Sequence, residues 1–259
     1  MKLLKIASWN VNGIRACHRN GFLRWLKRAR PDVLLLQEVR ADREQVPEEV
    51  ACYPGYEKIW CPATVRKGYS GTAIFTREKP LRVYSGVGRP EFDGEGRVAA
   101  VELAAATVVS AYFPNSQDLG RRLDYKLRFC DAIHEWLTKL RRRGKPVVLG
   151  GDYNIAPYPI DLARPEDNEQ TPGYLPEERE WMRQYLSSGW VDTFRHLYPD
   201  KVQYSWWSMR TRARERNIGW RIDHHTVHRS DRERIAGVAI EDRVNGSDHC
   251  PVRLELALD

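Results

Sequence analysis

Short apolar segments, most of them closed by a polar residue or a turn, recur along the whole of this 259-residue chain. Several, such as Val33–Gln37 and Val147–Gly150, show no alternation between apolar and polar residues. Segments of this kind are typical of strands whose two faces are both covered by other layers. We therefore predict strands at Lys5–Asn10, Val33–Gln37, Thr72–Thr76, Val98–Leu103, Thr107–Phe113, Val147–Gly150 and Val252–Leu256.

Helical patterns lie between these strands. Apolar residues recur every three or four positions over 123–140, which predicts a helix with one apolar face. Two further helices are predicted at about 22–30 and 177–188. Because strands and helices interleave without a linker of different composition, we expect a single α/β domain over residues 1–259.

Charge and composition indicate a globular fold, but they are compatible with several functions. The chain has 42 Lys and Arg against 35 Asp and Glu, a net charge of +7. Such an excess attracts nucleic acid, anionic lipid and small phosphates alike. A hydrophobic content of 42% supplies ample material for a core and excludes wholesale disorder.

The cysteines and the apolar runs indicate where the protein works. Five scattered cysteines form no Cys-x-x-Cys pair, which argues against structural zinc and favours free thiols in a reducing compartment. The apolar stretch at the N-terminus is too short for a signal peptide, and no run is long enough to span a membrane. We expect a cytoplasmic protein that does not enter the membrane.

Short polar residues cluster at the ends of the predicted strands. In α/β folds, sites collect in the crevice at strand ends, and carboxylate and amide oxygens there are ligands for Mg²⁺ or Mn²⁺. Each residue alone is ordinary at a turn, but their recurrence beside one histidine predicts a metal-assisted site. The residues are Asn10, Glu38, Asp152, Asn154, Asp223 (at the end of a further predicted strand, Trp220–Asp223), Asp248 and His249.

Seven motifs occur in order along the chain: Ser8-Trp-Asn-Val-Asn-Gly-Ile-Arg-Ala16, Leu36-Gln-Glu38, Gly68-Tyr-Ser-Gly-Thr-Ala-Ile-Phe75, Tyr112-Phe-Pro-Asn-Ser116, Gly151-Asp-Tyr-Asn154, Gly219-Trp-Arg-Ile-Asp223 and Gly246-Ser-Asp-His-Cys-Pro-Val252. Together they closely resemble the exonuclease III family of apurinic/apyrimidinic (AP) endonucleases. The resemblance extends from Lys5 to Leu256. It implies a four-layer α/β sandwich with two packed mixed β-sheets flanked by helices.

The resemblance also implies an activity. Members of the family hydrolyse the phosphodiester 5′ to an abasic site in duplex DNA with the help of a divalent metal, Mg²⁺ or Mn²⁺. They also trim blocked 3′ ends and degrade DNA in the 3′→5′ direction. We therefore expect double-stranded DNA with abasic sites or blocked 3′ ends as the partner, and a monomer.

By the same resemblance, individual residues acquire roles. Asp152 is the general base or the proton donor, and Asn154 orients the attacking water. Tyr112 and His249 contact the phosphate, and Asp223 orients the histidine and raises its pKa. The implied metal-binding residues are Asn10, Glu38, Asp152, Asn154, Asp248 and His249.

The segment 206–219 is the second informative region. It begins with two tryptophans and then holds four arginines in seven residues, a mixture that suits a surface gripping the DNA backbone. By resemblance, Trp206, Trp220 and Ile222 line a pocket for a flipped-out abasic sugar, which such a pocket selects by shape. The other expected DNA or lesion contacts are Lys67, Tyr69, Asn115, Arg210 and Arg212.

Some alternatives stay open at this point. The segment 206–219 could be a solvated arginine loop beside a tryptophan cluster. The chain could act on a phospholipid or inositol phosphate, bind DNA without cutting it, or bind RNA without a metal. His224 and His225 could hold a second metal, change the pH dependence or lie on the surface. We interpret Asp192 as a structural cap for a helix over Thr193–Leu197.

Overall fold

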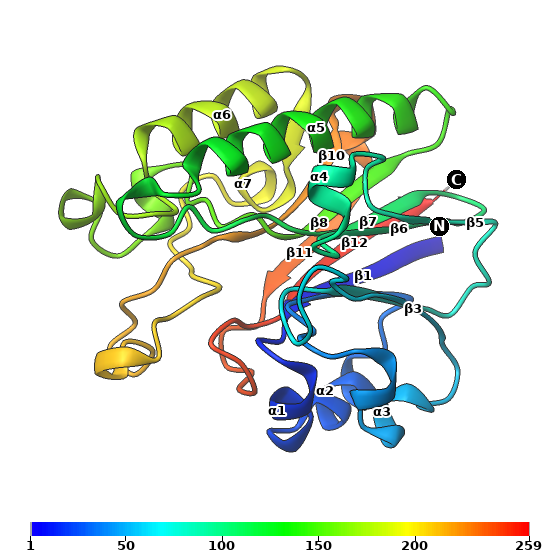
Figure 1. Ribbon diagram of the computed structural model, residues 1–259. Helices are drawn as coiled ribbons and strands as arrows, with labels where there is room; N and C mark the ends of the chain where they lie inside the picture. Colours follow the sequence, from blue (N-terminus) through cyan, green and yellow to red (C-terminus); the bar gives the residue numbers. More distant parts are fainter. Residues whose placement is uncertain (1, 259) are drawn as a thin grey trace.

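Two six-stranded mixed β-sheets lie between layers of helices in the computed structural model (Figure 1). The structure describes residues 2–258, so the two outermost residues of the predicted domain, Met1 and Asp259, lie outside the described residues.

The first sheet has the order β11-β12-β1-β2-β4-β3. Its strands are β1 (Lys2–Asn10), β2 (Val33–Gln37), β3 (Glu57–Cys61), β4 (Thr72–Thr76), β11 (Ile235–Ile240) and β12 (Val252–Leu258). The second sheet has the order β5-β6-β7-β8-β10-β9. Its strands are β5 (Arg82–Ser85), β6 (Val98–Glu102), β7 (Thr107–Tyr112), β8 (Val147–Asp152), β9 (Trp190–Asp192) and β10 (Asp223–His228).

Helices cover the outer face of each sheet (Figure 1). The first sheet carries α1 (Ile14–Arg19), α2 (Phe22–Ala29) and α3 (Glu48–Ala51). The second carries α4 (Pro90–Asp93), α5 (Leu123–Arg141) and α6 (Pro176–Ser187). The short helix α7 (Thr193–Leu197) instead packs against β10 of the second sheet and β11 of the first, and its Phe194 joins the core between the sheets. Short 3₁₀ turns occupy η1 (Arg43–Gln45), η2 (Asp118–Gly120), η3 (Pro159–Asp161), η4 (Glu166–Asn168), η5 (Arg210–Arg212) and η6 (Arg229–Arg234). No helix formed by residues 2–258 combines the length and the apolar character needed to cross a membrane.

The apolar core follows these four layers. One cluster of buried side chains fills the space between the two sheets and includes Leu35, Val148 and Leu254. A second packs α5 and α6 onto the second sheet, and a third packs α1 and α2 onto the first. The predicted four-layer α/β sandwich is therefore confirmed.

The central strands run so that their ends meet on one edge of the sandwich. β1 pairs with β2 in parallel, with Asn10 opposite Gln37. β7 pairs with β8 in parallel in the second sheet, with Tyr112 opposite Asp152. Because the two sheets pack face to face, the carboxyl ends of both parallel pairs lie near one another.

The buried strands match the prediction, whereas strands with an exposed or polar character were missed. All seven predicted strands are present with ends shifted by a few residues, and the helices near 22–30, 123–140 and 177–188 are confirmed. β3 and β5 lie at sheet edges, β9 has only three residues, and β10 has the polar sequence DHHTVH. The prediction that Asp223 ends a strand is wrong: it begins β10 and lies opposite Asp152 in an antiparallel pair.

A buried cluster of charges ties the second sheet to the loops above it. Arg221 is fully buried and donates from Nε to Oδ1 of Asp161 at 2.7 Å and from Nη2 to Oδ2 of Asp192 at 2.7 Å. The other carboxylate oxygen of Asp192 accepts from the backbone N–H groups of Phe194 and Arg195, so the predicted helix cap is confirmed. Arg221 thus fixes the segment that carries Trp220 and Ile222.

We expect Arg221→Met to destabilise the fold by about 3–5 kcal/mol, because it leaves two buried carboxylates without their shared cation. The free energy of unfolding, measured by chemical denaturation, checks this. Arg128→Met is the matched control, since Arg128 forms exposed ion pairs and its loss should leave the stability nearly unchanged. Equal effects of the two substitutions would contradict the role of Arg221.

Candidate active site

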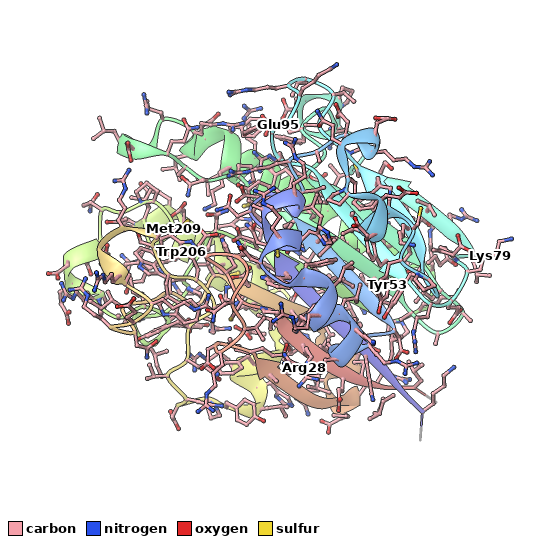
Figure 2. The ribbon with its side chains drawn as sticks, turned by 90° about the horizontal axis from the view of Figure 1, so that it is seen from below. Arg28, Tyr53, Lys79, Glu95, Trp206 and Met209 are labelled. Carbon is pink, nitrogen blue, oxygen red and sulfur yellow. The ribbon has the colours of Figure 1, made fainter. Side chains whose placement is uncertain are left out.

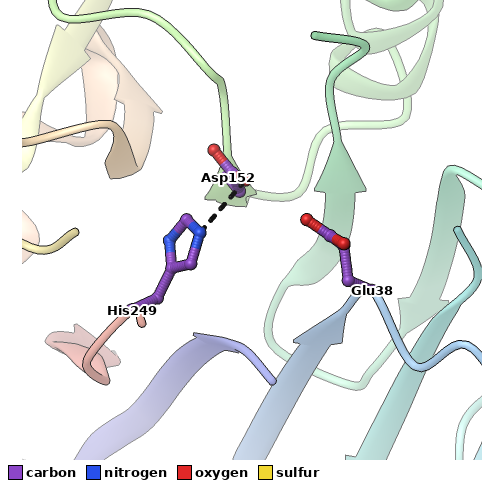
Figure 3. Close-up of side chains that lie close together, drawn as sticks. All are labelled: Glu38, Asp152 and His249. Atoms are coloured by element: carbon purple, nitrogen blue, oxygen red, sulfur yellow. Dashed lines mark ion pairs between the residues drawn. The ribbon is translucent and has the colours of Figure 1, made fainter. Parts of the chain in front are cut away.

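Three side chains that can hold a metal converge where the central strands end. Glu38 directly follows β2, Asp152 ends β8, and His249 lies shortly before β12. Each offers a ligand atom within 4.8 Å of the others, and all three side chains are buried (Figure 3). The two carboxylates come from different sheets, so the sandwich itself brings them together.

The backbone around this cluster adopts a rare conformation. Asn12, Glu38, Arg40 and Asn154 have φ of 43°, 49°, 50° and 51°. Residues other than glycine rarely occupy this left-handed region, and a long side chain there costs roughly 1–3 kcal/mol. These four residues lie in the turns that follow β1, β2 and β8, and all four line one cleft.

Amide groups link the carboxylates. Nδ2 of Asn10 donates to Glu38 Oε1 and to Asp152 Oδ2, each at 2.9 Å. The backbone N–H of Asn154 donates to Asp152 Oδ1 at 2.8 Å, and its side chain donates to Oδ2 at 3.2 Å. In this arrangement Asn10 presents its amide nitrogen to the carboxylates, while its oxygen accepts from the backbone N–H of Asn12 at 3.0 Å. The donor set remaining around Glu38 and Asp152 is rich in oxygen, as a hard divalent cation requires.

A histidine–aspartate pair forms the opposite side of the cluster. Nδ1 of His249 lies 2.9 Å from Oδ2 of Asp223, which also accepts from the hydroxyl of Ser205 at 2.6 Å. Nε2 of His249 points towards Asp152, 3.9 Å from Oδ2 (Figure 3). Burial lowers the pKa of His249, but the attraction of Asp223 and Asp152 outweighs it and raises that pKa. Burial raises the pKa of Asp152, and the charges of Asp223 and Glu38 add to the rise against the opposing effect of His249.

Tyr112 lies at the edge of the cluster over a buried arginine. The guanidinium of Arg97 lies 4.7 Å from the centre of the Tyr112 ring and donates to its backbone oxygen at 3.1 Å. Burial and the charge of Glu38 raise the pKa of Tyr112 well above its usual value, so its hydroxyl keeps its proton as a donor. Arg97 and Arg122 also donate to the hydroxyl of Tyr69, at 2.8 and 2.7 Å.

A cleft of about 210 Å³ opens above the cluster. Trp206, Trp220 and Ile222 line one wall, where the two indole rings meet edge to face at 84°. Asp248 is held on this wall by Trp206 Nε1 at 3.0 Å and Asn12 Nδ2 at 2.9 Å, and it does not belong to the cluster of Glu38, Asp152 and His249. The remaining lining residues are Asn12, Glu38, Arg40, Tyr112, Asn115, Asp152, Asn154, Thr171, Pro172, Gly173, Asp248 and His249.

Some predicted DNA contacts lie outside this cleft. Lys67, Tyr69, Arg210 and Arg212 are not among the residues in the described range that line it. Arg212 lines a neighbouring groove of about 480 Å³ together with Met209, which is 81% exposed and is labelled in Figure 2.

The arginine loop is also less uniform than its sequence indicates. Arg214 folds back over the Trp207 ring at 4.5 Å and donates to the backbone oxygens of Asp242, Val244 and Ser247. The donors of Arg214 are therefore used within the protein, unlike those of an arginine that only faces solvent.

Sequence reasoning missed several lining residues. Arg40 forms an ion pair with Glu38, and Thr171–Gly173 form a wall of the cleft. The only sequence signal for the second was the unusual length of the loop over 153–174, which is typical of functional loops.

The adjacent histidines are structural. Both are buried, so their interpretation as surface residues is wrong. Nδ1 of His224 accepts from Arg221 at 2.9 Å, and its Nε2 donates to the backbone oxygen of Ile155 at 2.9 Å. His225 projects between the sheets close to Gly150, and within residues 2–258 neither of its ring nitrogens has a hydrogen-bond partner. In that range neither histidine joins a group of metal-ligating side chains.

Comparison with known proteins agrees with this arrangement. Residues 7–249 match the Endonuclease/Exonuclease/phosphatase family. An exodeoxyribonuclease from Bacillus subtilis (strain 168) is 44% identical over 256 residues, covering 97% of this chain and 98% of that protein. The DNA repair nuclease APEX1 from Danio rerio is 38% identical, covering 98% of this chain and 83% of that protein. The crystal structure of the AP endonuclease LMAP from Leishmania major superposes with a TM-score of 0.90 at 27% identity, covering 100% of this chain and 89% of that one.

Buried His225 predicts a dependence of stability on pH. Burial, with a smaller contribution from His224, lowers the pKa of His225 to about 3. Below about pH 6.5 this imidazole is therefore protonated in the unfolded chain but stays neutral in the folded protein. The free energy of unfolding then falls as the pH falls. For one such site the loss between pH 7 and pH 5 is about 2 kcal/mol.

We expect His225→Leu to lose less stability between these two pH values than the unchanged protein does. Urea denaturation at pH 7 and pH 5 measures the difference. Comparing each protein with itself cancels the change in packing that leucine introduces. If both proteins lose the same stability, His225 is not the titrating group.

Proposed function

Since the chain belongs to the Endonuclease/Exonuclease/phosphatase family, we propose that it is a DNA-repair nuclease. It hydrolyses the phosphodiester 5′ to abasic sites in duplex DNA, degrades DNA in the 3′→5′ direction and trims blocked 3′ ends. The observation that carries this proposal is the cluster of Glu38, Asp152 and His249 on the floor of a cleft with an aromatic wall. Hydrolysis of a phosphodiester anion needs neutralised charge and an activated water, and such a cluster provides for both.

Glu38 and Asp152 are the residues that would hold the metal, with Asn10 and Asp248 beside them. We propose Mg²⁺, with Mn²⁺ accepting the same oxygen ligands. When bound, such a cation neutralises phosphate charge and lowers the pKa of water. The buried, amide-braced carboxylates support this assignment, because their oxygens are acceptors held in one place.

The protein's own side chains handle the phosphate and the proton. Asp152 exchanges the proton of the attacking water, a role supported by its position on the floor of the cleft, where its Oδ2 lies 3.9 Å from Nε2 of His249. Asn154, braced by Asn115 Nδ2 at 3.2 Å, orients that water. The hydroxyl of Tyr112 donates to the phosphate, and Nε2 of His249 presents a positive N–H to it. The contact of Nδ1 of His249 with Asp223 leaves Nε2 free to face the cleft, which supports the phosphate contact.

The aromatic wall supports recognition of a missing base. Trp206, Trp220 and Ile222 leave a narrow apolar space beside the catalytic cluster, which suits a deoxyribose without its base. We propose that Lys67, Tyr69, Arg210 and Arg212 contact the DNA backbone around this cleft, and that the protein acts as a cytoplasmic monomer.

Duplex DNA with one abasic-site analogue should be incised in the presence of Mg²⁺, left intact with excess EDTA, and incised again when Mg²⁺ is restored. Gel analysis of an end-labelled strand measures this, and 3′-end degradation is scored on the same gel. Undamaged duplex, RNA and an inositol phosphate are the comparison substrates. Equal cleavage with and without EDTA, or preferential hydrolysis of RNA or the inositol phosphate, would contradict the proposal.

We expect Asp152→Asn to lower kcat by about 100-fold or more while DNA affinity changes little, because the amide fits the same space but cannot take the proton. Incision assays and DNA-binding titrations separate the two effects. Asp200→Asn makes the same chemical change at an exposed turn and should leave both unchanged. Lost binding with retained turnover would exclude the assigned role.

A further inference from the structure

We propose that the buried ion pair of Lys126 and Glu178 is a positioning unit that sets the geometry of the catalytic cleft. Lys126 lies on α5 and Glu178 on α6, and neither side chain lines the cleft. The inference rests on the proposed function, since it concerns how that cleft is held in shape.

The pair is completely removed from water. Both side chains have 0% exposure, and Nζ of Lys126 lies 2.6 Å from Oε1 of Glu178. A buried ion pair of this kind is a weak source of stability, because apolar residues of similar volume usually stabilise a fold as well or better. The charges therefore call for an explanation other than stability.

Glu178 binds two segments that border the cleft. Its Oε1 also accepts from the hydroxyl of Ser116 at 2.6 Å, next to Asn115. Its Oε2 accepts from the backbone N–H groups of Gly173 at 2.6 Å and Leu175 at 3.0 Å. One carboxylate thus fixes the 115–116 turn and the 173–175 wall together.

Lys126 binds a third segment, the turn that carries the catalytic asparagine. Its ammonium group donates to the backbone oxygen of Asn154 at 2.7 Å. Asn154 has a left-handed backbone at φ 51°, a conformation that needs external support. The ammonium group supplies that support from behind the cleft.

The backbone of Gly173 packs closely against its neighbours. Its φ is +97°, and a Cβ atom at this position would lie 3.3 Å from the Asn154 oxygen and 3.3 Å from Cζ3 of Trp220. Its own oxygen accepts from the N–H of Ala156 at 2.8 Å. A small shift of Gly173 would therefore disturb both the catalytic turn and the aromatic wall.

Glu178 also has a purely structural interpretation, because its contact with the N–H of Leu175 caps α6. Two double variants separate capping from positioning. K126M/E178Q removes both charges together, keeps an acceptor oxygen for Gly173 and Leu175, and abolishes the contact with Asn154. K126M/E178L abolishes the contacts with Gly173 and Leu175 as well. Tyr185→Phe is the matched control, since it removes a buried hydrogen bond from the same helix to Thr226 without touching the cleft.

We expect K126M/E178Q to lower kcat on abasic duplex at least tenfold with little change in KM, while its melting temperature stays close to that of Tyr185→Phe. K126M/E178L should in addition lose discrimination between abasic and undamaged duplex. Its 171–175 backbone amides should exchange with deuterium faster than in the unchanged protein, as measured by mass spectrometry.

The outcomes separate the two proposals. If the unchanged protein cuts abasic DNA but folded K126M/E178Q retains its kcat within twofold, the positioning role is wrong. A fall in kcat of the same size in Tyr185→Phe would also overturn it, because general destabilisation would then suffice. Should K126M/E178L not fold, the kcat of K126M/E178Q still decides. If the unchanged protein leaves abasic DNA intact, the proposed function fails. Unchanged amide exchange at 171–175 in folded K126M/E178L would separately overturn the positioning role.

Discussion

The site depends on one geometric constraint, the parallel pairing of β1 with β2 and of β7 with β8 in two sheets that pack face to face. Parallel strands end on the same edge, so Glu38 from one sheet and Asp152 from the other arrive at the same point. Bringing like charges together in a buried place is costly, and the amide of Asn10 and the imidazole of His249 offset part of that cost. A buried cluster of side chains that can hold a metal follows from the way the layers pack.

Behind the cleft, buried cations support its walls from three directions. Arg97 lies under Tyr112, Arg221 lies behind the segment of Trp220 and Ile222, and Lys126 holds the turn of Asn154. Each cation has a buried or partly buried carboxylate partner. Such pairs are directional, so they fix positions that apolar packing alone would leave free to shift.

The basic residues behind the net charge of +7 have different roles in the folded molecule. Some arginines, such as Arg97, Arg214 and Arg221, are used inside the protein and are not available to a partner. Others, such as Arg210 and Arg212, lie on the projecting loop beside the cleft. The carboxylates of the candidate site, Glu38 and Asp152, lie instead at the ends of buried strands.

The sequence by itself determined which strands are buried on both faces and which polar residues follow them, because periodicity and local chemistry are written into consecutive residues. It indicated Glu38, Asp152 and Asn154 in this way, and the resemblance of whole motifs supplied the two-sheet arrangement and the partners of His249. The edge strands β3 and β5 were not predicted, since an edge strand needs no continuous apolar run. Only the tertiary structure decided that Arg40 pairs with Glu38, that Gly173 packs against Trp220, and that Lys126 reaches Asn154. The contacts of Gly173 with Trp220 and of Lys126 with Asn154 join segments distant in sequence, and they form only when loops from separate strands and helices close over one edge of the sandwich. The pair of Arg40 and Glu38 is local, but it needs the left-handed backbone that both residues adopt in the folded loop.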